Sequence, residues 1–195
     1  RLSNVLEVVT KRRINMKKML LLFLTLIFTA VLSAEEYSVT EQKEILKQFT
    51  IFQKAVKSKD INTLSNMVEF PLQSSVYGKF PIDDEDGVMS KKAFMSNKNN
   101  ILNLFDELTL IKVDSAKNSI VEYTKKNKKE EINSKARFLA VNDEVYQNEE
   151  KAFVVVYSND EIPEDDEDFT GGRSDYFFFQ LKDNKLKLVR MYSLP

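Results

Sequence analysis

Two stretches in the last third of the chain decide its fold: Ala152 to Tyr157, AFVVVY, and Tyr176 to Phe179, YFFF. Both are apolar at every position and are flanked by polar residues, which is typical of β-strands. A strand of a half-solvated sheet alternates apolar and polar side chains, so these runs predict strands that are covered on both faces. Further strand-like runs at 136–141 and 186–192, with an Asp183-Asn184 hairpin turn before the last, predict an antiparallel sheet.

Helical patterns precede these strands. Ser38 and Glu41 have the spacing of a capping box, and the apolar residues that follow recur on one helical face: Ile45, Phe49, Phe52 and Val56. Asp60 predicts a second, shorter helix that ends at Glu69-Phe70-Pro71, and Ser90 predicts the start of a third. We predict additional strands at 72–77, 108–113 and 120–123, and one shared core that contains Phe49, Phe52, Phe105, Val154, Val156 and Phe178.

The segment from Phe52 to Leu72, FQKAVKSKDINTLSNMVEFPL, resembles small exported bacterial members of the nuclear transport factor 2-like (NTF2-like) superfamily. Ser90 to Phe105 fits the third helix of that fold, and residues 136–192 fit its sheet. The resemblance implies an α+β fold, the NTF2-like cone, in which three N-terminal helices pack on a strongly curved antiparallel sheet. It also implies a pocket at the open end of the cone.

A targeting segment precedes the domain. Met16-Lys17-Lys18 is followed by an apolar run from Met19 to Leu32 and a small-residue exit at Ser33-Ala34, the pattern of a secretory signal peptide. We expect residues 1–15 to be an upstream extension outside the fold, residues 16–34 a signal peptide, and residues 35–195 a single NTF2-like domain. The expected location is the periplasm or the bacterial exterior, and an uncut membrane anchor is the alternative.

Composition excludes much enzyme chemistry. The 195 residues include no Cys, His or Trp, which removes disulfides, thiol nucleophiles, His-based metal sites and Ser-His or Cys-His catalytic pairs. Residues 1–34 hold six basic side chains and one acidic, so residues 35–195 carry 23 basic and 29 acidic side chains. An acidic domain of this kind repels nucleic acid, and we expect no nucleic-acid partner.

Five residues are candidates for a ligand site in the cone: Tyr157, Asp175, Tyr176, Arg190 and Tyr192. Period-two counting places Arg190 on the face of Leu186, Leu188 and Tyr192, where its guanidinium would bind an anionic group. The three tyrosines offer hydroxyl donors, and Asp175 shares a face with Phe177 and Phe179. The alternatives are that Arg190 pairs with an acid or reaches solvent, that the tyrosines are core, and that Asp175 lies in solvent.

Seven carboxylates fall within residues 160–168. Their order does not match an EF-hand loop, so we expect no metal site and no cofactor. We predict instead that residues 158–173 form a flexible solvated loop.

Three functions remain open. The first is a non-catalytic envelope protein whose cone binds a small apolar or amphipathic ligand or a protein partner, and the sequence favours it over an enzyme. The second is a His-independent hydrolase or isomerase that uses Asp, Tyr and Arg. The third is a structural or interaction module that forms a homodimer through the outer face of its sheet. Membrane contact is expected only through the signal peptide before cleavage.

Overall fold

The computed structural model describes residues 36–75, 87–141, 150–161 and 172–194. The predicted extension and signal peptide at 1–34 lie outside these ranges, as does most of the predicted acidic loop. In the described part of the chain, no helix combines the length and apolar character needed to cross a membrane.

The longest helix, α2 (Val39–Lys57), begins at the predicted capping box. The Ser38 hydroxyl accepts a hydrogen bond from the Glu41 backbone N–H at 3.3 Å, and the Glu41 carboxylate accepts one from the Ser38 N–H at 2.7 Å. The predicted apolar stripe is its buried side, with each member at most 1% exposed: Ile45, Phe49, Phe52 and Val56.

Shorter helices follow α2. Asp60 caps α3 (Ile61–Asn66) through a hydrogen bond from the Thr63 N–H, as predicted. Ser90 caps the predicted third helix, but this helix is divided at Asn97, where the backbone leaves helical geometry. Its two parts are α4 (Lys91–Ser96) and α5 (Lys98–Asp106), and a 3-10 turn, η1 (Glu107–Leu110), continues α5.

A seven-stranded sheet makes up most of the rest, and its strand order is β2-β1-β9-β8-β7-β6-β5. All neighbours are antiparallel except β1 and β9, which are parallel. The strands are β1 (Val68–Ser75), β2 (Val88–Met89), β5 (Tyr123–Lys126), β6 (Glu130–Val141), β7 (Glu150–Glu161), β8 (Arg173–Lys182) and β9 (Lys185–Leu194). A separate hairpin pairs β3 (Lys112–Asp114) with β4 (Ser119–Val121). The fold is therefore α+β, with a large, mainly antiparallel sheet.

Several predicted boundaries shift. The first strand already begins at Val68, so Phe70-Pro71, a cis peptide, lies inside β1 instead of ending a helix. The predicted strand at 108–113 is the 3-10 turn η1 followed by β3. Residues 158–161 are not loop, because they are paired in β7. The Asp183-Asn184 turn is confirmed, with φ of 49° and 58°.

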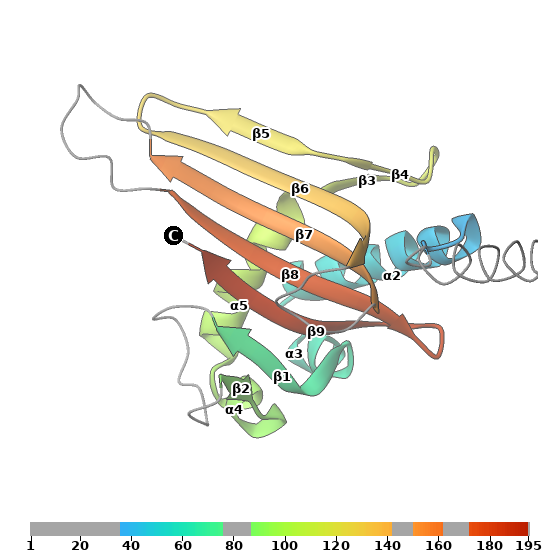
Figure 1. Ribbon diagram of the computed structural model, residues 1–195. Helices are drawn as coiled ribbons and strands as arrows, with labels where there is room; N and C mark the ends of the chain where they lie inside the picture. The colour runs from blue at the N-terminus through green and yellow to red at the C-terminus, as the bar shows by residue number, and fades with distance from the viewer. Residues whose placement is uncertain (1–35, 76–86, 142–149, 162–171, 195) are drawn as a thin grey trace, which may run out of the picture.

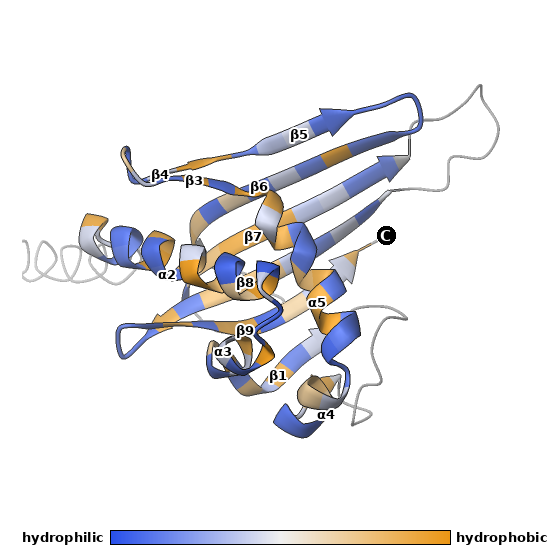
Figure 2. Ribbon diagram, turned by 180° about the vertical axis from the view of Figure 1, so that it is seen from behind, coloured by the Kyte–Doolittle hydropathy of each residue, from blue (hydrophilic) through white to orange (hydrophobic). Residues whose placement is uncertain are grey.

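The helices cover one face of the seven-stranded sheet, which we call the inner face (Figures 1 and 2). Alternate residues of β7 and β8 point toward this face, and all four are 0% exposed: Phe153, Val155, Phe177 and Phe179. The Phe49 ring of α2 lies 5.1 Å from that of Phe153 and 5.6 Å from that of Phe179. Phe105 of α5 packs on Phe177 at 6.3 Å, so aromatic rings fill the middle of the inner face.

The intervening residues point to the opposite face, the outer face, and none of the described helices lies over it (Figure 1). Ala152, Val154 and Phe178 form a second buried cluster there, with Val156, Tyr176 and Tyr192 packed against it. The prediction of one shared core is therefore wrong for Val154, Val156 and Phe178. A one-residue step along a strand reverses the side chain, and the sheet separates the two sets.

Candidate functional site

The five candidate residues lie on opposite faces of the sheet. Tyr157 and Asp175 are cross-strand neighbours on the inner face. Tyr176 and Tyr192 are neighbours on the outer face, where Arg190 also lies. The structure therefore brings them together in two groups.

The predicted face of Arg190 is wrong because β9 contains a bulge. Phe178 pairs with Arg190 whereas Phe179 pairs with Leu188, which leaves Val189 as an extra residue in β9. Such an insertion reverses the alternation beyond it. Leu186 and Leu188 are accordingly buried in the inner core, while Arg190 follows Phe178 to the outer face.

Asp175 is 1% exposed and not in solvent. Arg173 donates to it twice, once from Nε to Oδ1 at 2.8 Å and once from Nη2 to Oδ2, and the Ser193 hydroxyl donates to Oδ1. A buried carboxylate needs such donors because water no longer solvates it. Arg173 was missed in the sequence, although a residue two positions from Asp175 must share its face.

Tyr157 lies opposite both Asp175 and Ser134 at this polar end of the inner face. Burial raises the pKa of its hydroxyl, and the negative charges of Glu107 and Glu130 raise it further, against the effect of Arg173. The Tyr157 hydroxyl therefore keeps its proton at neutral pH, which favours a hydrogen-bond donor over a base. The buried Ser134 hydroxyl has no hydrogen-bond partner among the described residues.

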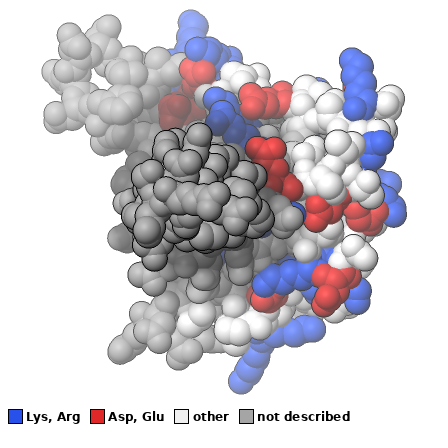
Figure 3. Space-filling model, turned by 45° about the vertical axis from the view of Figure 1, so that its right-hand side comes forward, with Lys and Arg blue, Asp and Glu red and all other residues white. Residues whose placement is uncertain are grey.

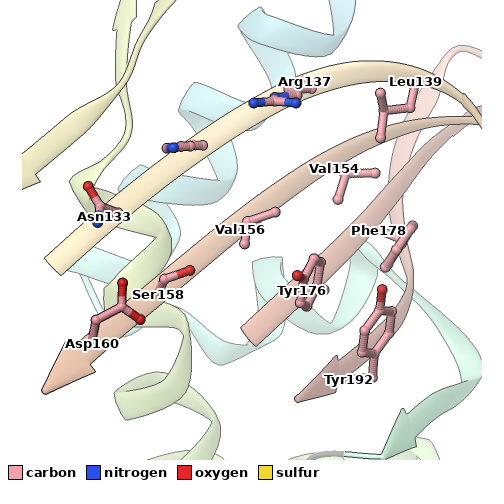
Figure 4. A pocket seen from close by; sticks show the side chains of 11 residues that line it. Asn133, Arg137, Leu139, Val154, Val156, Ser158, Asp160, Tyr176, Phe178 and Tyr192 are labelled. Carbon is pink, nitrogen blue, oxygen red and sulfur yellow. The ribbon is translucent and has the colours of Figure 1, made fainter. Parts of the chain in front are cut away.

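The outer face carries a groove of about 600 Å³ (Figure 4). Its floor is formed by side chains from three neighbouring strands: Val154, Val156, Tyr176, Phe178 and Tyr192. The Tyr176 and Tyr192 rings stack with centroids 4.6 Å apart and 14° between their planes, and the Phe178 ring stacks on Tyr192 at 5.4 Å. The floor is therefore a continuous aromatic and aliphatic surface.

Cationic side chains border this floor on two sides. Lys135 and Arg137 line the groove from β6, and both are exposed. On the β9 side, Arg190 lies next to Phe178, and its Nε donates to Gln73 Oε1 at 2.7 Å. Asp160 supplies an acidic group at one end of the groove.

Lys135 and Arg137 were not among the site residues predicted from the sequence. The signal was available, because Lys135, Arg137 and Leu139 alternate with period two along β6 and so share a face. On the side that Figure 3 shows, the basic and acidic side chains of the described residues are interspersed.

The chemistry available at the two groups differs. The inner group holds a carboxylate that its own arginine and serine already satisfy. The outer group offers an apolar floor with cations beside it, a combination whose chemistry is complementary to an amphipathic anion. Within the described residues, no three carboxylates gather to hold a metal ion.

Comparison of the chain with protein-family models, with curated proteins and with solved structures finds no match.

Proposed function

We propose that this protein is an exported, non-catalytic binding protein of the bacterial envelope that binds an amphipathic partner in its outer-face groove. The observation that carries the proposal is the aromatic floor of Tyr176, Phe178 and Tyr192 with Lys135 and Arg137 beside it. A floor of this area attracts apolar groups, and the cations select those that also carry negative charge. The signal-peptide pattern at 16–34 supports export.

We also propose that the domain is an NTF2-like cone. In support, α2 and α5 lie together on the inner face of a long, bent sheet (Figure 2), in the order that the resemblance implies. Binding inside the cone is less favoured than binding in the groove, because Phe49, Phe52, Phe153, Phe177 and Phe179 occupy the middle of the inner face with no exposed area.

Catalysis has less support than binding. Asp175 would have to lose its hydrogen bonds to Arg173 and Ser193 before it could take a proton. Tyr157, the nearest phenol in register, has a raised pKa and does not ionise at neutral pH.

The test uses anilinonaphthalene sulfonate, an aromatic anion whose fluorescence rises in apolar surroundings. We expect the protein to bind this dye, and Tyr176→Ala to weaken the binding about tenfold by removing a stacked ring of the floor. Tyr123→Ala is the matched control, because Tyr123 is a partly exposed residue of β5 outside the groove. Equal weakening by both substitutions, or none by either, would reject the groove as the site.

Homodimerisation through the same face is a second candidate. It is favoured by the apolar cluster of Ala152, Val154 and Phe178, which no described helix covers. Light scattering distinguishes the two: a dimer that Tyr176→Ala converts to a monomer supports self-association, whereas a monomer at all concentrations supports a separate partner.

A further inference from the structure

We infer that the partner in the outer-face groove is an amphipathic α-helix of another protein, with acidic side chains along both edges of its apolar stripe. This inference rests on the proposed function and adds the shape and charge of the partner. It follows from the backbone of the sheet, from the width of the floor and from the positions of the cations.

The backbone of the sheet favours a helical partner over an extended one. At the floor residues of β7, β8 and β9, each strand is already paired with a neighbouring strand on both sides. The outer face therefore presents side chains and few backbone donors or acceptors. An extended peptide laid on it would bury its own N–H and C=O groups without partners, whereas a helix satisfies them internally.

One row of cross-strand neighbours gives the width of the floor. Arg137 of β6 pairs with Val154, Val154 with Phe178, and Phe178 with Arg190 of β9. The two arginines are three strand spacings apart, about 14 Å at roughly 4.8 Å per spacing. A helix with its side chains is about 10–12 Å across, so one helix fills the floor and reaches a cation on each side.

The charged side chains at the ends of this row and of the next one indicate the charge of the partner. In the next row Lys135 pairs with Val156, Val156 with Tyr176, and Tyr176 with Tyr192. Cations thus lie on both long sides of the floor, apolar side chains lie at its centre, and Asp160, the one acidic group among the described lining residues, is confined to one end. The complementary surface has apolar side chains in the middle and carboxylates at both margins, as an amphipathic helix with acidic flanks has.

The experiment uses two synthetic 18-residue peptides labelled with fluorescein. Both carry the same leucine stripe at helical spacing, and one has Glu and the other Lys at the flanking positions. We expect fluorescence anisotropy to show the Glu peptide bound at least about tenfold more tightly than the Lys peptide, with the difference decreasing as salt is added.

Variants locate the contacts. Arg137→Gln and Arg190→Gln should each weaken the binding of the Glu peptide about threefold to tenfold, because each removes the cation on one edge of the floor. Lys98→Gln, on the exposed start of α5, is the matched control and should have no effect. Tyr176→Ala should weaken the binding of both peptides, because it removes part of the apolar floor.

Three results would overturn the inference. Equal affinity for the two peptides would show that the cations do not select the partner. Binding of the dye without binding of either peptide would reject a helical partner while leaving the groove as a binding site. A dimer that blocks the groove and that neither peptide displaces would make a second copy the occupant.

Discussion

The inner and outer faces of the sheet are built from the same strands but differ in what covers them. In β7 and β8 the residues facing inward are Phe153, Val155, Phe177 and Phe179, all 0% exposed beneath α2 and α5. The residues facing outward are also apolar, yet they form a groove. A strand that is apolar on both sides can therefore have one face buried beneath helices and the other in a surface groove.

The largest expected difference between the faces is in stability. Phe177→Ala should lower the free energy of unfolding by about 3–5 kcal/mol, because it leaves a cavity in the inner core beside Phe105. Its neighbour on the other face, Tyr176, is partly exposed, and Tyr176→Ala should cost about 1 kcal/mol. Urea denaturation of the two variants measures both; equal costs would mean that the outer face is core as well.

The buried carboxylate of Asp175, at the polar end of the inner face, tests whether the two faces are independent. Asp175→Asn should cost about 2 kcal/mol, because it weakens the hydrogen bonds from Arg173 and Ser193 to a buried carboxylate. Glu44→Gln, in a surface pair with Lys47, is the control and should cost less than about 0.5 kcal/mol. Dye binding in the outer groove should be unchanged in both variants, and a loss of dye binding in Asp175→Asn alone would show that the two faces are coupled.

The helix that covers the inner face gives a third prediction. Ser38→Ala should cost about 1 kcal/mol at pH 7 through loss of the α2 cap. Hydrogen bonds from Ser38 also hold the pKa of Glu41 below its usual 4.5. A carboxyl group whose pKa is lowered on folding stabilises the fold at pH values above its unfolded pKa. This stabilisation is lost as the pH falls through its folded pKa. The difference from the wild type should therefore shrink in acid; a constant difference from pH 7 to pH 3 would contradict it.

The smallest predicted effect is confined to alkaline pH. The folded pKa of Tyr157 is raised, so the fold favours its neutral form. The contribution to stability is fully present below the ordinary value of 10.0 and is lost as pH rises above it through the raised folded value. Tyr157→Phe cannot ionise and should lose less stability above pH 10 than the wild type. Thermal melts at pH 8 and at pH 10.5 make the comparison, and parallel losses would show that Tyr157 ionises normally.

Local patterns predicted the elements well. The capping box at Ser38, the cap at Asp60 and the Asp183-Asn184 turn depend on neighbouring residues only, and all three are confirmed. The last four strands were also placed correctly, although their ends were predicted too short.

Features that depend on strand pairing were not predictable from one sequence. The bulge at Val189 appears only when β8 is aligned with β9, and it moves Arg190 to the other face. The sequence alone did not decide whether the Asp175 side chain lies in solvent or in the core. The pairing of β8 with β9 decides it, because it brings Ser193 of β9 beside the carboxylate. Alternation does show that Val154 and Val155 face opposite ways, but it does not say which of them the helices cover.

The most direct test of the account compares two adjacent valines of β7. Val155 is 0% exposed on the inner face, and Val156 is partly exposed in the floor of the groove. The chain has no cysteine, so Val155→Cys and Val156→Cys each introduce a single thiol of similar size. With a thiol reagent in native buffer, we predict that Cys at position 156 reacts about a hundredfold faster, since position 155 must wait for the fold to open. Equal rates at the two positions would contradict the assignment of the outer face as the binding surface.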